Sequence, residues 1–528
     1  MAVHNYFVAS FILICLPGTQ LQKIFPVPRV EDQAYWHAQA TADIEHAIKV
    51  ATTQNWGIAK NIVMFVGDGL GITPTVAGRI YKGQRRFGHS GEEGYLSWEK
   101  FPHLALIKNY NLDETIPDSG ATATALFCGA KGNFYTLGLD HGVKRDQCME
   151  SLNQKNWQSS IMSWAQDANK DTGFVTTTTV THATPAALYA HSPSRYWECD
   201  ASLGEIGHGC RDIAKQLVED APGKNAKVIM GGGRLPLGAS KFPTIPRICK
   251  RNDGRNLTHE WVVSKSVHGH TVKYVQTAEE LLSADVSKTD YLMGLFDKGH
   301  MNFEAERDKS PRGQPSLANM TSVAIKILSK NKRDGFFLMV EGGRIDHALH
   351  LTESKRALED IIAFDEAIQT GLSMLDLSET LVIVTADHSH VMTINGYSKR
   401  GNDILGISDV KSAIDDMPYP TLMYTNGPRY AHYWDGKKVR RPDVRKEGTS
   451  SLGYQPTVAV PDIYETHSGD DVAAYATGPM SHLLHSLHEQ SYIAHVMGLA
   501  ACIGPYRDNC TRPEIQLFRL HNRHTNLL

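Results

Sequence analysis

The 528-residue sequence has no internal repeat, no low-complexity tract and no apolar run long enough to cross a membrane. Its formal net charge is only −3, so no basic surface of the kind that binds nucleic acid is expected. With 41% hydrophobic and 21% charged residues, its composition is typical of a globular protein with a large core. The absences therefore argue against membrane-spanning, repeat and nucleic-acid-binding classes.

An apolar stretch near the start, residues 6–16, is too short to span a bilayer but fits the core of a secretory signal. No Lys or Arg precedes it, so residues 1–20 mark only an approximate signal peptide, and residues 21–528 form the mature chain. The polar tail after Cys510 has no apolar run of the kind a lipid-anchor signal needs. We therefore expect a soluble, secreted protein. Three glycosylation sequons are compatible with secretion: Asn256, Asn319 and Asn509.

Cysteine is scarce, with 8 residues, and one of these, Cys15, lies inside the expected signal. The remaining seven are an odd number, so at least one thiol stays unpaired within the chain. Cys502 and Cys510 are near enough in sequence to close a small loop, and Cys148 and Cys210 to close a longer one. Spacing alone does not decide between these and other pairings.

Short β-like runs alternate with helical patterns from residue 61 to about 395. This alternation predicts an α/β fold with a doubly wound, mainly parallel central sheet flanked by helices. Residues 396–464 are rich in Gly, Pro, Tyr, Lys and Arg, and we interpret them as a small inserted subdomain. Helices are expected over 31–56 and over roughly 480–501. The predicted strands are 61–66, 104–108, 173–178, 227–230, 291–294, 336–340 and 381–385.

The stretch FFLMVEGGRIDHALH, 336–350, carries side chains suited to a metal. Glu341 ends the predicted strand. If a helix begins near Gly343, Asp346 and His350 are four residues apart and share one face. A carboxylate and an imidazole placed together suit a divalent metal. A capped surface helix with a solvated His is the equally simple alternative.

Two further strands favour the metal. Asp387 and His388 follow the run 381–385, and Asp68 follows the run 61–66. In open α/β sheets, ligands bind beyond the carboxyl ends of the strands. Three strands that deliver acidic or His side chains to one edge predict a polynuclear metal centre.

Ser119 stands at the start of a predicted helix of small residues, PDSGATATALFCGA. Such a Ser is commonly only a helix cap. Here the small residues allow a ligand to approach, and an oxyanion is expected to meet free backbone N–H groups. The sequence around Ser119 lacks the G-x-S-x-G elbow, so activation by a metal is favoured over a Ser–His–Asp arrangement. The GDGLG loop around Asp68 matches a dinucleotide loop only in part, and Asp68 repels phosphate unless a cation lies between them.

The segment 175–197 adds His182 and Thr184, just beyond a strand-like run, and Arg195. A guanidinium holds two phosphate oxygens at once, so Arg195 is a candidate phosphate clamp. Taken singly, an Arg at such a position is more often part of a surface salt bridge.

Six motifs in this order together resemble the alkaline phosphatase family, in its animal tissue-type branch: VGDGLG, PDSGATATA, THATPAALYAH, VEGGRIDHALH, TADHSHV and ETHSGDDVA. The resemblance runs from about Tyr35 to Tyr506. It implies hydrolysis of phosphate monoesters of broad range through a phosphoserine on Ser119, with two zinc ions and one magnesium ion per chain. The alternatives are a phosphodiesterase or sulfatase of the same superfamily, or a secreted binding protein derived from the enzyme.

The resemblance also implies roles for individual residues. One zinc is expected at Asp346, His350 and His467, and the second at Asp68, Asp387 and His388, beside Ser119. Magnesium is expected at Asp68, Thr184 and Glu341. His182 is expected to hold a magnesium-bound water, His347 to support the first zinc site, and Arg195 to clamp the phosphoryl group.

A fourth, calcium-type site of the family is expected to be weak or absent in this sequence. Its Phe–acid pair survives as Phe296 and Asp297, but Gln314 replaces a second acid. The segment 236–250, which supplies a third acid in the family, is shortened and basic.

The family pairing implies the disulfides Cys148–Cys210 and Cys502–Cys510, with Cys128 buried and free. Cys199 and Cys249 have no family counterpart and are left as candidates to pair with each other.

The resemblance further implies a homodimer. Residues 396–464 resemble the crown subdomain at the dimer interface, and Tyr397 matches a Tyr that reaches toward the partner's active site. The helix 31–56 is expected to embrace the other subunit.

Overall fold

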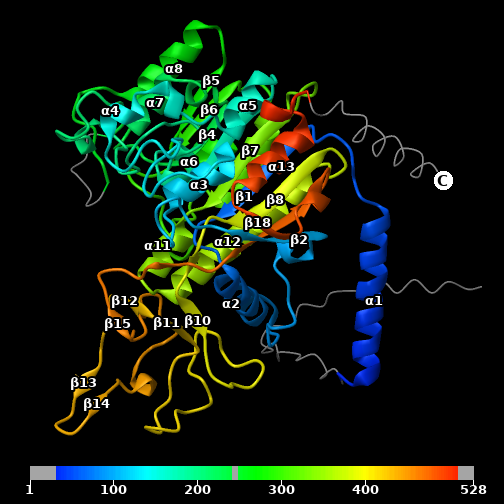
Figure 1. Ribbon diagram of the computed structural model, residues 1–528, viewed down its shortest axis with the longest axis vertical. Coiled ribbons are helices and arrows are strands. Elements are labelled where there is room, and N and C mark those ends of the chain that lie inside the picture. The colour runs from blue at the N-terminus through cyan, green and yellow to red at the C-terminus, as the bar shows by residue number, and fades with distance from the viewer. Residues whose placement is uncertain (1–30, 241–247, 509–528) are drawn as a thin grey trace, which may run out of the picture. The chain divides into compact units, whose positions relative to one another are not determined.

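The computed structural model describes residues 31–240 and 248–508 (Figure 1). The expected signal peptide, Asn509 and Cys510 lie outside these ranges. The chain divides into two units, one ending at Ile48 and the other beginning at Lys49. The expected N-terminal helix is present as α1 (Gln33–Thr52), most of which belongs to the first unit.

The second unit is built on a ten-stranded sheet with the strand order β18-β2-β17-β8-β1-β7-β3-β4-β6-β5. Only β17 runs antiparallel to its neighbours, which confirms the predicted mainly parallel sheet. All seven predicted strands are present, and β5, β17 and β18 are additional. The strands are β1 (Asn61–Gly67), β2 (His103–Lys108), β3 (Asp171–Thr179), β4 (Val228–Gly232), β5 (Val272–Val275), β6 (Tyr291–Leu295), β7 (Phe336–Gly342), β8 (Thr380–Ala386), β17 (Val472–Thr477) and β18 (Ser486–Glu489).

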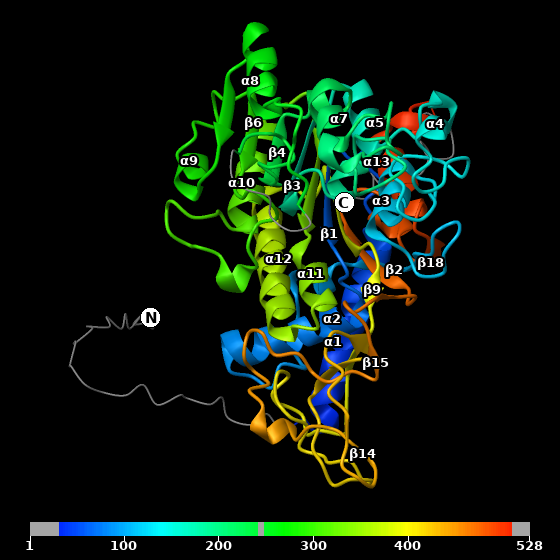
Figure 2. The same cartoon turned by 90° about the vertical axis from the view of Figure 1, so that its left-hand side faces the viewer.

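Helices cover both faces of this sheet, as the doubly wound prediction requires (Figure 2). One layer contains α10 and α12, and the other contains α3, α5 and α13. The principal helices are α2 (Ile72–Lys82), α3 (Ser119–Cys128), α5 (Ile161–Asp167), α7 (Ile213–Glu219), α8 (Leu257–Val267), α10 (Leu317–Leu328), α11 (Arg344–His350), α12 (Ser354–Met374) and α13 (Tyr492–Ala501). The shorter ones are α4 (Cys148–Ser151), α6 (Ala183–Ala186) and α9 (Ala278–Leu282).

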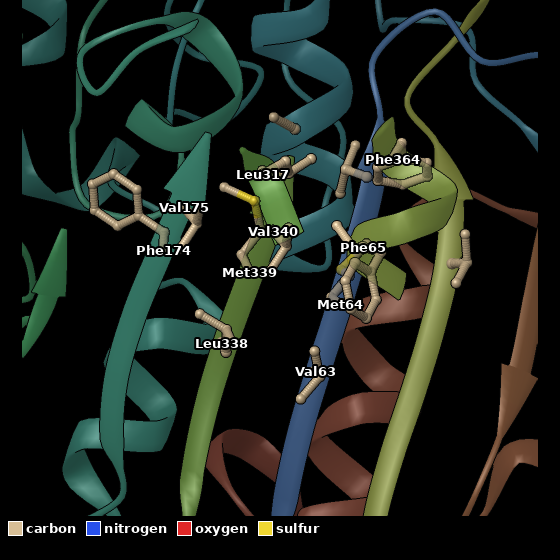
Figure 3. Close-up of a cluster of buried hydrophobic side chains, with 14 of the residues drawn as sticks. Val63, Met64, Phe65, Phe174, Val175, Leu317, Leu338, Met339, Val340 and Phe364 are labelled. Carbon is tan, nitrogen blue, oxygen red and sulfur yellow. The ribbon is translucent and has the colours of Figure 1, made fainter. Parts of the chain in front are cut away.

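The central strands β1, β7 and β8 are buried along their whole length because helices cover both sides. Figure 3 shows part of this core, where Phe65 of β1 lies edge-on against Phe364 of α12 at a centroid distance of 6.2 Å. In the register of the three strands, Gly67 is opposite both Gly342 and Ala386. The strands therefore end at the same level, and the residues that follow them meet at one edge.

The prediction of a helical region over 480–501 was wrong in its first half. Residues Ser486–Glu489 form β18, and the helix α13 begins only at Tyr492. The reason is tertiary: β18 pairs in parallel with β2, with Ser486 opposite Ala105, so sheet hydrogen bonds outweigh local helix preference.

Residues 396–464 fall in the region of short two-stranded ladders at the foot of Figure 1. These are β10 (Met392–Ile394) with β11 (Leu422–Tyr424), β12 (Asn426–Gly427) with β15 (Val460–Pro461), and β13 (Tyr433–Trp434) with β14 (Val439–Arg440). Their small size agrees with the weak sequence periodicity of the segment.

The predicted disulfide Cys148–Cys210 is present, and Cys199 pairs with Cys249. Cys128 is free and buried, as expected. Cys502 is also disulfide-bonded, whereas its predicted partner lies outside the described residues. Within residues 31–240 and 248–508, no helix combines the length and the apolar character needed to cross a membrane.

Candidate active site

The predicted ligands meet at the edge where β1, β7 and β8 end. Asp68 follows β1, Glu341 is the last residue but one of β7, and Asp387 follows β8. A helix does begin beyond Gly343, and it brings His350 Nε2 to 3.3 Å from Asp346 Oδ1. This short distance between a carboxylate and an imidazole favours the metal-site prediction for the segment over the alternative of a solvated surface His.

Asp346, His350, His390 and His467 form a group whose potential ligand atoms lie within 4.8 Å of one another. His467 Nε2 lies 3.1 Å from His350 Nε2 and 3.3 Å from Asp346 Oδ1. Burial would raise the pKa of Asp346, but His350 and hydrogen bonds from His390 and His467 hold it well below its usual value. Asp346 is thus a carboxylate, and a carboxylate with imidazoles is a suitable ligand set for zinc.

A metal would be bound by the Nε2 atoms of His350 and His467, because their other ring nitrogens contact backbone carbonyls. The Nδ1–H of His467 donates to the carbonyl of Pro117 at 2.7 Å, and that of His350 donates to the carbonyl of Glu465. Metal-binding histidines commonly donate their second N–H in this way. Burial lowers the pKa of His350 to about 4, so its ring is neutral near pH 7.

The sequence analysis missed His390, a member of this group, and Glu465, which contacts it. His390 Nε2 lies 2.8 Å from Asp346 Oδ1, and its Nδ1 contacts Glu465 Oε2. Burial would lower the pKa of His390, but the facing carboxylates raise it to about 10. His390 lies inside the motif TADHSHV and Glu465 inside ETHSGDDVA, so the motifs did contain the signal.

Ser119 is the first residue of α3, and Asp118 rather than Ser119 caps the helix. The Ser119 hydroxyl lies 3.0 Å from His388 Nε2, and His388 Nε2 lies 3.4 Å from Asp68 Oδ1 and 3.2 Å from Asp387 Oδ2. Asp387 is fixed because its Oδ1 accepts from the backbone N–H of Gly69 at 3.0 Å. His388 therefore links the serine hydroxyl to Asp68 and Asp387, the other two expected ligands of the second zinc.

Free backbone N–H groups were expected beside Ser119, but those of the next two residues, Gly120 and Ala121, are already hydrogen-bonded. The Asp118 carboxylate accepts from Gly120 N at 2.8 Å and from Ala121 N at 3.4 Å. A side-chain cap has therefore taken the donors that an oxyanion would use.

Asp68, Thr184 and Glu341 contribute buried oxygens that have no hydrogen-bond partner among the described residues. These are both carboxylate oxygens of Asp68, Oε1 of Glu341 and Oγ1 of Thr184. Burial, reinforced by the neighbouring acids Asp387, Asp346 and Glu341, raises the pKa of Asp68 well above its usual value, and burial raises that of Glu341 to about 7. Buried, unpaired oxygens that resist ionisation fit a site completed by a cation, and an all-oxygen set suits magnesium.

Arg195 contacts Asp118, the residue that directly precedes Ser119. Its Nη1 donates to Asp118 Oδ2 at 3.2 Å, and its Nη2 lies 3.2 Å from His182 Nε2. The guanidinium is thus held by two partners, and its ion pair with Asp118 is buried rather than part of the surface.

His182 and His347 belong to a third group, together with His300, which the sequence analysis did not single out. His347 Nδ1 accepts from Arg344 Nη1 at 2.8 Å, and His300 Nδ1 accepts from the backbone N–H of Thr179 at 3.0 Å. His347 therefore lies beside His182 rather than within the group of Asp346 and His350. No motif contains His300, so sequence reasoning had no signal for it.

The calcium-type position is filled by protein groups. Gln314 Nε2 donates to Asp297 Oδ2 at 2.6 Å, and the backbone N–H of Lys298 donates to Asp297 Oδ1 at 2.6 Å. Both oxygens of Asp297 are therefore satisfied without a cation. Part of the segment 236–250 lies outside the described residues.

A buried serine, an arginine and four overlapping groups of potential metal ligands at the carboxyl edge of a parallel sheet define a metal-binding α/β enzyme. The sequence model of the family described as alkaline phosphatase matches residues 59–503. The tissue-nonspecific alkaline phosphatase of Gallus gallus is 43% identical over 511 residues, covering 95% of each chain. The alkaline phosphatase of Gadus morhua is 42% identical over 497 residues, covering 92% of this chain and 100% of that protein.

The chain belongs to the alkaline phosphatase family, and it is a phosphomonoesterase hydrolase. Solved structures agree on the fold. The alkaline phosphatase of Thermus thermophilus superposes with a TM-score of 0.59 at 23% identity, over 85% of this chain and 92% of that chain. The enzyme of the Antarctic bacterium TAB5 gives 0.56 at 22% identity, over 84% and 98%.

Proposed function

We propose that this enzyme hydrolyses phosphate monoesters through a phosphoserine on Ser119, with two zinc ions and one magnesium ion. The observation that carries the proposal is the position of Ser119, whose hydroxyl lies 3.0 Å from His388 Nε2, which in turn lies 3.4 Å from the buried Asp68 and 3.2 Å from the buried Asp387. The proposed ligands are Asp346, His350 and His467 for the first zinc, Asp68, Asp387 and His388 for the second, and Asp68, Thr184 and Glu341 for magnesium.

When bound, the zinc ions would lower the pKa of the attacking hydroxyl and neutralise the charge that develops on the leaving oxygen. Ser119 loses its hydroxyl proton as Oγ attacks phosphorus, the P–O bond to the alcohol breaks, and the leaving oxygen takes a proton from water and departs as the alcohol. Water then attacks the phosphoserine and releases inorganic phosphate. Because Ser119 is the first residue of α3, its ester lies at the positive end of a helix dipole, which favours the phosphoryl charge.

Arg195 is proposed to bind two of the phosphoryl oxygens. Asp118 holds one side of the guanidinium, and His182 contacts the other, so the side chain is already directed when substrate arrives. Such preorganisation avoids paying for reorientation during the reaction. His182 and His347 are proposed to hold water at the magnesium site. Because the proposed contacts all involve the phosphoryl group, a broad range of leaving alcohols is expected.

The deciding experiment measures the metal content of the purified enzyme together with its turnover of an aryl phosphate monoester and of a matched diester. We expect zinc and magnesium in a 2:1 ratio and a strong preference for the monoester. Ser119→Ala should keep the metals and lose nearly all turnover. A wild type that contains the metals but prefers the diester would overturn the assignment of the reaction.

The calcium-type site is proposed to bind no calcium, because Gln314 supplies the donor that Asp297 needs. Calcium at full stoichiometry in enzyme that is first saturated with zinc and magnesium and then supplied with calcium would contradict this. The test is independent of the zinc and magnesium assignments, because the two positions share no residue.

A secreted homodimer is proposed as the working form. The segment 396–464 leaves large apolar side chains uncovered, including Tyr397 at 94% and Ile414 at 91% exposure. Uncovered apolar groups of this kind are typical of an interaction surface. The disulfides and the sequons at Asn256 and Asn319 are compatible with secretion and glycosylation. Sedimentation of the purified protein should give twice the chain mass, and a glycosidase should reduce the apparent mass on a gel.

A further inference from the structure

The clamp arm, defined here as residues 195–199, carries Arg195 at its start and is attached to the molecule at several points. The backbone N–H of Arg195 donates to the carbonyl of Tyr135 at 2.9 Å. Further along, the carbonyls of Trp197 and Glu198 accept from Ile213 N at 2.9 Å and Ala214 N at 3.1 Å. These bonds fix the backbone of the arm against α7.

Glu198 is a buried carboxylate within this arm, three residues after Arg195. Its Oε2 accepts from the hydroxyl of Thr179 at 2.7 Å and from that of Thr181 at 2.6 Å. Thr179 is the last residue of β3, and Thr181 directly precedes His182. Glu198 therefore connects the arm with the loop that carries His182.

Cys199 ends the arm, is fully buried and forms a disulfide with Cys249. The segment 249–253 that it reaches is itself anchored. The buried Arg251 side chain donates to both carboxylate oxygens of Asp212, at 3.0 and 2.8 Å, and to both of Asp253, at 2.8 and 2.9 Å. The disulfide thus ties the arm to a rigid support.

We propose that Glu198 and the Cys199–Cys249 disulfide are positioning elements that set the direction of Arg195 and thereby the affinity of the enzyme for phosphate. A long Arg side chain binds two oxygens well only when its backbone is fixed, because small displacements spoil a bidentate contact. The fixed position of Arg195 matters more in this site because fewer backbone N–H groups are free to bind the phosphate. Asp118 has taken the N–H groups of Gly120 and Ala121, so the guanidinium has few neighbours to compensate for it.

The inference rests on the proposed role of Arg195, and its test separates the two. The competitive inhibition constant of inorganic phosphate is measured alongside kcat, metal content and Tm. Wild type is compared with Cys199→Ala/Cys249→Ala, Glu198→Ala and Glu198→Gln. We expect the inhibition constant to rise about tenfold in the double variant and in Glu198→Ala, with zinc and magnesium retained and kcat changed less. Glu198→Gln should restore most of the affinity, because an amide oxygen still accepts from both hydroxyls.

The matched control is Cys148→Ala/Cys210→Ala. The two disulfides span similar sequence separations, 62 and 50 residues, so their loss destabilises the chain to a similar degree. The sulfurs of Cys148 and Cys210 contact Ser151, His208 and each other's segment rather than the clamp arm. We expect a lower Tm in this control with an unchanged inhibition constant.

An unchanged inhibition constant in both the disulfide variant and Glu198→Ala would overturn the proposal, as would an equal rise in the control. If Arg195→Ala itself leaves the constant unchanged, the proposed clamp fails and the positioning inference fails with it. If Arg195→Ala weakens phosphate while the arm variants do not, only the positioning inference is wrong. The Glu198 variants keep the test valid if the double cysteine variant does not fold.

Discussion

His390 lies 2.8 Å from Asp346 through its Nε2, and its other nitrogen contacts the buried carboxylate of Glu465. The imidazole therefore connects a proposed zinc ligand with a second, deeper acid. It orients the Asp346 carboxylate and neutralises part of its charge. This differs from His350 and His467, whose free nitrogens point toward the proposed metal while their N–H groups bind backbone carbonyls.

Replacing His390 with Ala should loosen Asp346 and weaken zinc binding at that site by about 10 to 100-fold, the usual cost of losing such a partner. The rate of zinc loss to a chelator measures this directly. His390→Gln should recover part of the affinity, because the Gln amide still donates at the position of Nε2. The exposed His268→Ala serves as the control and should lose zinc at the wild-type rate. Equal rates for His390→Ala and wild type would show that Asp346 needs no such partner.

Thr184→Val should remove magnesium selectively. The Val side chain has nearly the same shape but no Oγ1, the atom that lacks a hydrogen-bond partner among the described residues. Elemental analysis should show zinc retained and magnesium reduced at limiting free magnesium. Thr184→Ser keeps the hydroxyl and should bind magnesium as the wild type does. A parallel loss of zinc in Thr184→Val would mean that the sites are not separable.

Gln314→Glu should convert the filled calcium-type position into one that needs a cation. Gln314 donates to Asp297 at 2.6 Å, so the substitution brings two carboxylates together with no donor between them. We expect a loss of about 1–3 kcal/mol in calcium-free buffer, the usual cost of an unsatisfied buried polar group. Calcium should restore the Tm of the variant and leave that of the wild type unchanged. A calcium-dependent rise in the wild type would contradict the assignment.

Lys170 should make the enzyme more stable at alkaline pH. It is buried and donates to the carbonyls of Lys60 at 2.9 Å and Asp334 at 2.6 Å, and burial lowers its pKa from 10.5 to about 8. Between these two values the unfolded chain holds a proton that the folded chain has released, so raising the pH favours folding. The contribution over this window is about 3 kcal/mol.

The measurement compares the unfolding free energy of wild type and Lys170→Met at pH 7.5, 9 and 10.5. The variant cannot titrate at this position, so the difference between the two proteins should grow with pH in favour of the wild type. Exposed Lys288→Met is the matched control and should track the wild type at every pH. A constant difference for Lys170→Met would show that the lysine stays charged in the folded protein.

The fold and the acidic ligands that follow the three central strands were predictable, because both depend on local sequence patterns. The β-branched runs that become β1, β7 and β8 are unambiguous, and parallel strands end at one edge, so Asp68, Glu341 and Asp387 had to lie near one another. The four-residue spacing of Asp346 and His350 likewise follows from the helix repeat.

The parts that could not be predicted depend on long-range contacts. β18 is a strand only because β2 offers an unpaired edge to Ser486–Glu489. His300 reaches His182 only through the fold, since more than a hundred residues separate them. The sequence also could not show that the Asp118 side chain accepts from the backbone N–H of Gly120. An Asp before a Ser is equally compatible with a helix cap and with a side chain that faces solvent.

The register of the central strands also constrains how such an enzyme can change. Gly67 lies level with Gly342 and Ala386, so adding or deleting one residue in β1, β7 or β8 would turn the following ligand to the opposite face. The lengths of these three strands are therefore as fixed as the ligands themselves. Variation in length should be tolerated at the outer strands β5 and β18, which carry none of the proposed ligands. An engineer who wishes to add a binding segment should place it there, and family members are expected to differ in size at those positions.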